Sequence, residues 1–376
     1  MSLHYTDAGV DLEAAEQITT RIRSQLAVGL FGGFVPVSEL KAYDAPVLVS
    51  SIDGIGTKVR LAARLGQVDG LGYDIVHHCV NDIAVHGASP LFFLDYLAFH
   101  RLEPELVERI VESIGRACEA LGIQLAGGET AEMPLVYPPG HFDVAGAVVG
   151  VVEQAKIIDG RSIREGDAIL GLPSSGLHTN GYSLVQTIFS DDEYGHSLPD
   201  TGRTLGQALL EPHRCYLDDL RQLIATGKVH GLAHITGGGI AGNLSRIMPP
   251  GLQAVIDLPK PPPLFAFLAR RGIPPEEMRR VFNMGIGMIA VCAPSPPNPP
   301  ETGSYSAPLG ASPRGSRPFR IPVGAAPCGC PPGRPQHVAW HNPIPTPVRE
   351  LGTIQKISTS DIQHQHERSV VIRDGD

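Results

Sequence analysis

Three acidic residues stand where a carboxylate could hold a cation. Asp53 follows an apolar run and opens a glycine-containing turn, Glu129 comes directly after two glycines, and Asp82 lies within an apolar helical run. Each has an ordinary interpretation, as a turn residue or as part of a solvated helix face. A carboxylate among apolar residues is costly unless it is paired or bound to a cation, and Mg²⁺ prefers oxygen ligands. Taken together, the three positions favour a shared Mg²⁺ site.

Glycine-rich turns could bring backbone N–H groups close to phosphate. One turn contains Gly32 and Gly33, another precedes Lys58, and a third includes Gly237 and Gly238. Glycine allows a close approach of the backbone, and a helix that starts at such a turn adds its dipole. Any one of these glycine stretches could equally be an ordinary tight turn between two elements, and the chain has no P-loop motif. Because the turns occur in both halves of the chain, they indicate two phosphate-bearing ligands, with Lys58 as a phosphate contact.

A loop in the second half gathers several polar side chains. It runs over residues 174–183 and includes Ser175, His178 and Asn180. An imidazole beside hydroxyl and amide groups suits proton transfer and the recognition of phosphate or amide groups. A single loop histidine is more often a surface residue, so the candidate site depends on the polar composition of the whole loop.

Alternating strands and helices must position these residues. The apolar run at 46–52 predicts a buried strand that ends beside the first carboxylate, and residues 103–122 carry the apolar stripe of an amphipathic helix. Strands at 91–97 and 123–126 flank that helix, which is the spacing of a strand–helix–strand crossover. Glu129, which follows Gly127 and Gly128, would then lie just beyond the strand at 123–126, where open α/β sheets bind ligands.

The second half alternates in the same way without repeating the sequence. The expected elements are strands at 168–172, 254–256 and 287–291 and helices at about 181–190 and 206–226. Residues 350–354 and 369–373 favour a terminal hairpin. The pattern as a whole predicts an α/β (α+β) protein.

Proline marks the main boundary in the chain. Residues 293–347 hold 16 of the 34 prolines and few large apolar residues, so this stretch cannot bury enough surface to offset the entropy of ordering. We interpret 293–348 as a disordered segment, either a genuine low-complexity insertion or the product of a GC-rich gene read out of frame. The expected domains are therefore 1–155 and, as one unit, 161–292 plus 349–376.

The composition excludes several classes of function. The chain of 376 residues has 30 Lys+Arg against 39 Asp+Glu, a net charge of −9. Nucleic-acid-binding proteins carry clustered positive charge, so this composition argues against that class. No apolar run approaches the ~20 residues that span a bilayer, and the amino terminus has no signal-peptide pattern. Six cysteines without metal-binding spacing fit a reducing cytoplasm. We therefore expect a cytoplasmic protein with small-molecule ligands and with no nucleic-acid or membrane partner.

Long motifs in both halves of the chain carry a family resemblance. They are Tyr5–Asp11, Ser51–Lys58, Asn81–Pro90, Gly127–Pro134, Asp143–Gly146, Ser174–Ser183, His234–Gly239 and Phe282–Met288. Residues Asn81–Pro90 contain the D-x4-G-A-x-P signature. Together these motifs resemble the ATP-binding aminoimidazole ribonucleotide (AIR) synthetase superfamily, and within it the cyclo-ligase branch. The resemblance covers about 1–292 and 349–376.

The resemblance implies a fold and a reaction. The fold would have two α/β domains, of which the N-terminal one binds ATP and forms a homodimer through its sheet. The reaction would be an ATP-dependent ring closure in de novo purine synthesis, in which formylglycinamidine ribonucleotide becomes aminoimidazole ribonucleotide and ADP and phosphate are released. ATP would phosphorylate the formyl oxygen, the amidine nitrogen would attack the activated carbon, and phosphate would leave.

The resemblance also implies roles for individual residues. His178 would move protons during ring closure. Mg²⁺, which neutralises phosphate charge, would be held by Asp53, Asp82 and Glu129. The nucleotide would contact Gly32, Gly33, Lys58, Asn81, Asp82 and Gly87. The second substrate would contact Ser175, Asn180, Thr236, Gly237 and Gly238.

The chain departs from the family pattern in three places. The loop at 25–29 is shorter, Arg23 stands where the family has a lysine, and 293–347 replaces a helix with its flanking turns. A non-catalytic nucleotide-binding homologue is therefore one alternative. Another is a different ATP-using member of the superfamily, such as a formylglycinamidine synthetase-like or thiamine-phosphate kinase-like enzyme. The motifs of the second half favour the cyclo-ligase.

Overall fold

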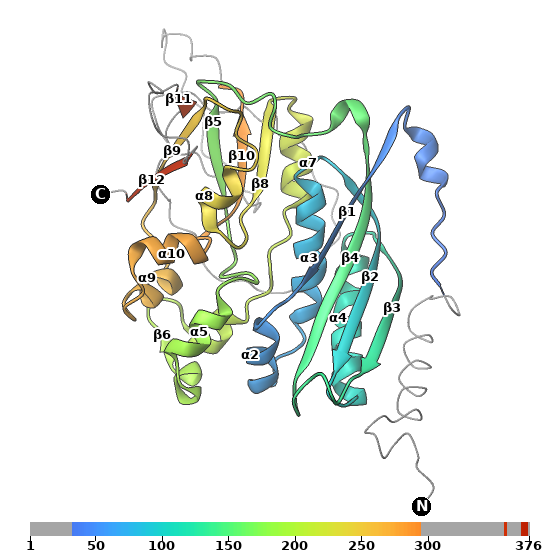
Figure 1. Cartoon of the computed structure of the whole chain (residues 1–376), viewed down its shortest axis with the longest axis vertical. Coiled ribbons are helices and arrows are strands. Elements are labelled where there is room, and N and C mark those ends of the chain that lie inside the picture. Colours follow the sequence, from blue (N-terminus) through green and yellow to red (C-terminus); the bar gives the residue numbers. More distant parts are fainter. Residues whose placement is uncertain (1–31, 295–356, 359–369, 375–376) are drawn as a thin grey trace, which may run out of the picture.

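The computed structural model describes residues 32–294, 357–358 and 370–374. The expectations for Arg23, for the loop at 25–29 and for most of the proline-rich stretch fall outside these residues. Within the described part, helices and strands alternate through two halves of the chain, as the sequence predicts (Figure 1). No helix among these residues combines the length and the apolar character needed to cross a bilayer.

A four-stranded mixed sheet forms the first half, with the strand order β1-β4-β2-β3. β4 is antiparallel to both of its neighbours, whereas β2 and β3 are parallel. The elements of this half are η2 (Ser38–Ala42), β1 (Pro46–Gly54), α2 (Lys58–Arg64), α3 (Leu71–Ala84), β2 (Ser89–Phe99), α4 (Pro104–Ala120), β3 (Gln124–Glu132), β4 (Phe142–Glu153) and η3 (Gln154–Lys156). Because the sheet is mixed, its strands do not all end at one edge.

The predicted crossover unit is confirmed. β2 leads into α4 and then into the parallel strand β3. α4 begins at Pro104, where the missing N–H costs no helical hydrogen bond, and it buries Ile110, Ile114 and Cys118 on one stripe. Apolar periodicity alone therefore locates this helix correctly.

α3 is the central helix of the molecule. It lies between the first sheet and the elements of the second half, as Figure 1 shows. Its residues are buried on nearly every side, including Ile75, Val76 and Ile83. A helix that is apolar all around belongs in the interior, so the polar residues within it need partners. Those partners build the site described below.

β1 is not the fully buried strand that its apolar run predicts. Val49 packs against the core, whereas Leu48 and Ile52 remain 60% and 77% exposed. Successive strand residues point to opposite faces, and α3 covers only one of them. Ile52 and Leu94 both pair with Ala147, so they share the other face of the sheet. Within residues 32–294, the large apolar side chains of that face remain exposed.

The described part of the second half contains two three-stranded sheets and one short two-stranded pairing. Their strand orders are β5-β10-β8 and β11-β9-β12, and β6 pairs with β7. The elements are β5 (Ala168–Pro173), α5 (Tyr182–Ile188), η4 (Asp191–Gly195), β6 (Ser197–Leu198), β7 (Arg203–Thr204), α6 (Leu205–Leu209), α7 (Leu217–Ala225), β8 (Val229–His234), α8 (Gly239–Leu244), β9 (Gln253–Leu258), α9 (Pro263–Ala269), α10 (Pro275–Val281), β10 (Ile286–Cys292), β11 (Ile357–Ser358) and β12 (Val370–Asp374).

One expectation for this half is wrong. The helix predicted at 206–226 is split into α6 and α7, because Pro212 cannot take part in an interior helical hydrogen bond. We call residues 210–216, which join these two helices, the crossing segment.

The expected terminal hairpin stays a prediction. Its second strand, β12, runs parallel to β9, and β11 lies antiparallel on the other side of β9. Residues 350–354, its expected first strand, lie outside the described residues.

A buried ion pair within the first half contacts the crossing segment of the second half. Lys58 and Asp74 are 1% and 0% exposed, and Lys58 Nζ lies 2.8 Å from Asp74 Oδ1. The ammonium group also donates to the carbonyl of Glu211 at 2.9 Å, and Asp74 Oδ1 accepts the N–H of His213 at 2.8 Å. Lys58 is therefore engaged within the protein, which favours a structural role over the expected phosphate contact.

Replacing Lys58 with methionine is expected to lower the free energy of unfolding by about 3–5 kcal/mol, because the Asp74 carboxylate is left buried without its counter-charge. The double variant Lys58→Met/Asp74→Asn is expected to recover much of that loss, since neither charge is then buried and the amide oxygen still accepts the N–H of His213. Urea denaturation of the three proteins measures these differences. Equal stability of the single variant and the parent chain would contradict the structural role.

Candidate active site

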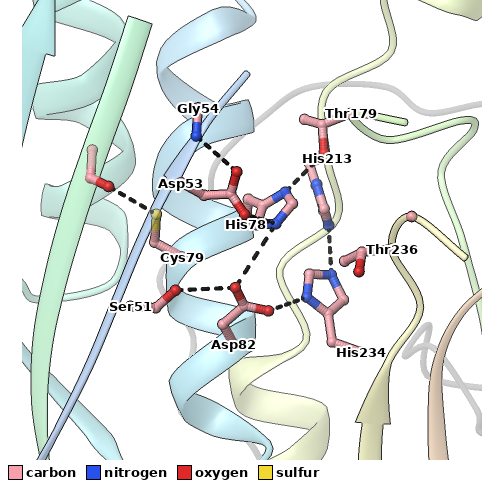
Figure 2. Close-up of polar contacts among 12 residues, drawn as sticks. Ser51, Asp53, Gly54, His78, Cys79, Asp82, Thr179, His213, His234 and Thr236 are labelled. Carbon is pink, nitrogen blue, oxygen red and sulfur yellow. Dashed lines mark hydrogen bonds and ion pairs between the residues drawn. The ribbon is translucent and has the colours of Figure 1, made fainter. Parts of the chain in front are cut away.

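Two carboxylates and a histidine meet between β1 and α3 (Figure 2). Asp53 lies near the end of β1, and α3 carries His78 and Asp82 one helical turn apart on one side. The Nε2 of His78 lies 2.9 Å from Asp53 Oδ2 and 3.8 Å from Asp82 Oδ2. Ser51 donates its hydroxyl to Asp82 Oδ2 at 3.0 Å. Alternation along β1 thus places Ser51 and Asp53 on the face that meets α3.

The second half of the chain contacts the same carboxylate. β8 ends at His234, whose Nδ1 lies 2.8 Å from Asp82 Oδ1, although the two residues are 152 positions apart. His213 of the crossing segment places its Nε2 3.0 Å from the Nε2 of His234. Thr179 Oγ1 lies 2.8 Å from His78 Nδ1. The site is therefore built between the two halves of the chain.

His178 lies buried beside this group in an uncommon backbone conformation. Its φ is +63°, in the left-handed region that a non-glycine residue adopts at a cost. Its ring stacks on that of His213 with 3.9 Å between the centroids, and its Nε2 accepts the N–H of Ser175 at 3.2 Å. Its Nδ1 has no hydrogen-bond partner among the described residues. Backbone strain and an unpaired buried polar atom are both typical of functional positions.

Both carboxylates are held in the ionised form. Burial alone would raise the pKa of Asp82, but hydrogen bonds and charge from His234, His78 and Ser51 lower it below its ordinary value. Burial would also raise the pKa of Asp53, and the hydrogen bond and charge of His78 outweigh it, so that this pKa is lowered too. Ionised carboxylate oxygens are the ligands that a hard cation binds.

His178 and His213 are held in the neutral form. Burial is the main cause, and it lowers the pKa of each imidazole well below its ordinary value. The positive charge that neighbouring histidines can carry adds to the effect. A neutral imidazole can accept a proton, as a general base must.

The lowered pKa values of His178 and His213 predict how the free energy of unfolding depends on pH. Because their folded pKa values lie well below the unfolded value of about 6.5, the unfolded chain binds protons first as the pH falls. The free energy of unfolding is therefore expected to fall below about pH 6.5, by up to about 1.4 kcal/mol per pH unit for each histidine. For His78, burial lowers the pKa but Asp53 and Asp82 raise it by more, so its pKa lies above the ordinary value. Its contribution to the free energy of unfolding therefore grows as the pH falls, which partly offsets the loss.

Urea denaturation between about pH 7.5 and 5.5 measures this dependence. The variant His178→Asn is expected to show a shallower fall in stability, because one histidine with a lowered pKa is gone, while His77 and His234, whose pKa values burial also lowers, remain. His141→Asn, which changes an exposed histidine, serves as the matched control. Stability that stays level or rises as the pH falls would contradict the neutral state of the buried pair.

Asn81, expected at the nucleotide, holds the crossing segment instead. Its side chain is buried within α3. Its amide donates to the carbonyl of Arg214 at 2.8 Å, and its Oδ1 accepts the N–H of Tyr216 at 2.8 Å. Both ends of the amide are thus used inside the protein, which favours a positioning role over contact with a ligand.

The three glycines expected at the nucleotide lie in the first half of the structure. Gly87 has a φ of +79°, which suits glycine at the turn after α3. Gly32 and Gly33 are exposed, and a Cβ on Gly33 would lie 1.9 Å from the carbonyl oxygen of Ala126 in β3. That close approach is itself a reason for glycine at position 33. A nucleotide contact at these glycines stays a prediction.

Glu129 does not join the other two carboxylates within the single chain. It lies inside β3 rather than beyond it, opposite Tyr96 of β2. β3 and β1 are the outer strands of the sheet, so three strand spacings, or about 14 Å, separate Glu129 from Asp53. Its neighbour Gly128 faces the side chain of Asp95, so Glu129 points to the opposite, uncovered face. Within the described chain Glu129 therefore lies apart from Asp53 and Asp82, and its role as a metal ligand stays a prediction.

The residues expected at the second substrate gather in one region. A Cβ on Gly237 would lie 3.2 Å from Asn180 Oδ1. Thr236 begins the same turn, in which Gly238 has a φ of +95°. Ser175 donates its hydroxyl to a backbone carbonyl of the crossing segment at 2.7 Å. Contact of these residues with a substrate stays a prediction.

Sequence reasoning missed three histidines of the site. No local metal-ligand spacing points to His78, His213 or His234. In the described residues, however, two groups place their ligand atoms within 4.8 Å of one another, and they are His178/His213/His234 and His78/Asp82/His234. The i,i+4 spacing of His78 and Asp82 on one helix was an available signal. The other pairings join distant segments, so no local pattern could reveal them.

Comparison with protein families defines the class of protein. Residues 40–152 match the family described as AIR synthase related protein, N-terminal domain, and residues 164–298 match its C-terminal domain. The crystal structure of HypE from E. coli has a similar fold, with a TM-score of 0.54 at 15% sequence identity over 74% of this chain and 82% of that one. The α/β AIR synthetase-like fold expected from the motifs is confirmed.

Curated relatives narrow the family further. The phosphoribosylformylglycinamidine cyclo-ligase of Desulfitobacterium hafniense is 47% identical over 307 residues, which are 78% of this chain and 90% of that protein. The cyclo-ligase of Nitrosococcus oceani is 46% identical over 302 residues, which are 77% and 84% of the two chains. This chain belongs to the phosphoribosylformylglycinamidine cyclo-ligase family.

Proposed function

We propose that this chain is a ligase that closes an imidazole ring at the expense of ATP in purine biosynthesis. The substrates are formylglycinamidine ribonucleotide and ATP, and the products are aminoimidazole ribonucleotide, ADP and phosphate. The observation that carries the proposal is the 46–47% identity to cyclo-ligases over most of both chains. The ionised carboxylates and neutral imidazoles of the site have the charge states that this chemistry needs.

His178 is the group that we assign to proton transfer. A proton must leave the amidine nitrogen as this atom attacks the formyl carbon, and the formyl oxygen departs with the phosphoryl group. The imidazole accepts that proton at Nε2, whose lone pair the N–H of Ser175 must first release, and the resulting imidazolium can deliver a proton from Nδ1 to the departing phosphate. Burial, which keeps His178 neutral, supports this role.

Asp53 and Asp82 have the donor chemistry for one Mg²⁺ ion. Both present ionised oxygens close to the Nε2 of His78. Mg²⁺ usually takes one or two protein carboxylates and completes its shell with water and substrate phosphates, so two carboxylates are sufficient. A bound Mg²⁺ would neutralise charge on the phosphates. Ser51 and His234 hold the two oxygens of Asp82 in place.

A homodimer in the cytoplasm completes the proposal. The uncovered face of the first sheet exposes four large apolar side chains, those of Leu48, Ile52, Leu94 and Tyr96. Such a face is normally covered by a partner, and a second copy of the sheet has the matching shape. The cysteines of the described residues are free thiols, which fits a reducing compartment.

Mass spectrometry of the products tests the proposed reaction. With Mg·ATP and formylglycinamidine ribonucleotide, the nucleotide product is expected to be lighter than its substrate by the elements of water and to form in the same amount as ADP. ADP formed without ring closure would favour another ATP-using member of the superfamily. No product of either kind would favour the non-catalytic homologue.

A further inference from the structure

His213 is held by the backbone contacts of its own segment. Its N–H donates to Asp74 Oδ1 at 2.8 Å, and its carbonyl lies 2.5 Å from the Nδ1 of His77. Asn81, on the same side of α3, holds the next residues of the crossing segment. These α3 side chains fix the position of the crossing segment and therefore the position of the His213 backbone, from which the ring extends.

Hydrogen bonds then fix the orientation of the ring. The carboxylate of Asp82 can only accept, so Nδ1 of His234 carries the proton and its Nε2 offers a lone pair. The Nε2 of His213 must therefore donate to it across 3.0 Å. The remaining nitrogen of His213, Nδ1, is a bare acceptor without a partner among the described residues. A single orientation of the His213 ring makes the hydrogen bond to His234, which is itself bonded to Asp82.

The His213 ring in turn supports the ring of His178. The two rings are nearly parallel, at 20°, with 3.9 Å between their centroids. On another side, Gly287 leaves room for the edge of His178, because a Cβ there would lie 2.4 Å from Cε1. The side chain of His178 has only the 3.2 Å contact with the N–H of Ser175 to hold it by hydrogen bonding. Its orientation therefore depends on packing.

We propose that His213 is a positioning residue for His178, fixed in place by the Asp82–His234 pair and by the contacts of α3 with the crossing segment. This inference rests on the proposed function, since it assigns His178 to proton transfer. His213 does not act on the substrate in this account. Its ring keeps the reactive imidazole in one plane and links that plane to a carboxylate of the proposed cation site.

The hydrogen bonds favour this role over a metal ion held by His178, His213 and His234. The lone pair of His178 Nε2 already accepts the N–H of Ser175, so Nδ1 carries the proton of the neutral ring. A metal on Nδ1 would move that proton to Nε2, where it would face the N–H of Ser175. The lone pair of His234 Nε2 is likewise used by His213.

Two variants of His213 separate support by the ring from a general structural effect. His213→Phe keeps an aromatic ring of similar shape against His178, whereas His213→Asn removes the ring. His196→Asn, which changes an exposed histidine, is the matched control. All are measured in the full-length chain for thermal melting, for kcat and KM with both substrates, and for the pH dependence of kcat. The parent chain is measured first in the same assay, so a failure of the proposed function is seen separately.

We expect His213→Asn to lower kcat by about 10–100-fold with KM for ATP changed less than about 2-fold, since a small misplacement of a reacting group can cost about 100-fold. His213→Phe keeps the stacked ring but loses the hydrogen bond to His234, so its kcat is expected to lie between that of the parent and that of His213→Asn. Water entering beside His178 in the asparagine variant relieves its burial, so the acid limb of the kcat profile is expected to move to higher pH. The charged groups that lower the pKa of His178 are His234, Lys58, His78 and Arg214, and all are retained, whereas the variant removes the imidazole of His213, whose own pKa burial lowers well below its ordinary value.

Two results would overturn the proposal in an active parent chain. If both variants keep the parent kcat, the ring gives no support to His178. If both lose kcat equally while their melting temperatures and acid limbs match the parent, the nitrogen atoms of His213 matter and ring stacking does not.

Discussion

Replacing His178 with asparagine lowers kcat by about 10²–10⁴-fold and leaves the affinity for ATP nearly unchanged. The large loss of kcat is expected because the neutral, buried imidazole is the group assigned to proton transfer. The affinity for ATP should change little because His178 is not assigned to the nucleotide contact. Asparagine is the informative replacement because it tolerates the positive φ of +63° that position 178 adopts. The loss is then due to the imidazole rather than to the backbone.

Steady-state kinetics and calorimetric titration with ATP measure the two quantities. His141→Asn, an exposed change of the same type, is expected to retain the parent values. If His178→Asn lost nucleotide binding while a bound complex still turned over at the parent rate, His178 would belong to the binding site and the proton-transfer role would be wrong.

Replacing Asp82 with asparagine is expected to lower Mg·ATP-dependent turnover by about 10³-fold, or about 4 kcal/mol, while the protein stays folded. The amide has nearly the same volume, its one oxygen can still accept from His234, and its NH2 group can donate to the hydroxyl oxygen of Ser51, so the local packing is kept. The negative charge that would hold a cation at the phosphates is lost. A weaker dependence of the rate on Mg²⁺ concentration should accompany the loss.

The control is Asp192→Asn, which changes an exposed carboxylate in η4. Turnover is measured over a range of Mg²⁺ concentrations, and circular dichroism checks the fold. Near-normal turnover of the Asp82 variant with an unchanged Mg²⁺ dependence would remove this residue from the proposed cation site.

Local sequence patterns predicted most elements of the fold. The amphipathic stripe of α4 and the apolar runs on either side gave the β2–α4–β3 crossover, because periodicity reports directly on which face is buried. One element failed for a physical reason, because Pro212 ends a helix that the apolar pattern alone would continue. The neighbours of β9 are set by long-range pairing, which no local pattern records.

The site was predicted in part. Asp53 and Asp82 meet as expected, because one ends a strand and the other lies on the helix that packs against it. Glu129 was placed wrongly because β3 continues past its apolar residues, and one step along a strand reverses the face. Lys58 was read as a phosphate contact because its partner, Asp74, lies on another helix.

The histidines show what a local reading cannot supply. His213 and His234 join the site through contacts across 136 positions between His77 and His213 and 152 positions between Asp82 and His234. Such contacts depend on how the two halves of the chain pack, which spacing along the sequence does not encode. The two hydrogen bonds of Asn81 to the crossing segment are of the same kind, and they favour a positioning role over the expected ligand contact.

The rate of phosphate release from ATP, measured with and without formylglycinamidine ribonucleotide, tests the central claim most directly. We predict slow release with ATP and Mg²⁺ alone and a large increase when the ribonucleotide is added, because ring closure requires the phosphorylated formyl oxygen to leave as phosphate. The same increase should be absent in His178→Asn. Release that does not respond to the ribonucleotide, or no release in its presence, would contradict the account of this chain as a cyclo-ligase.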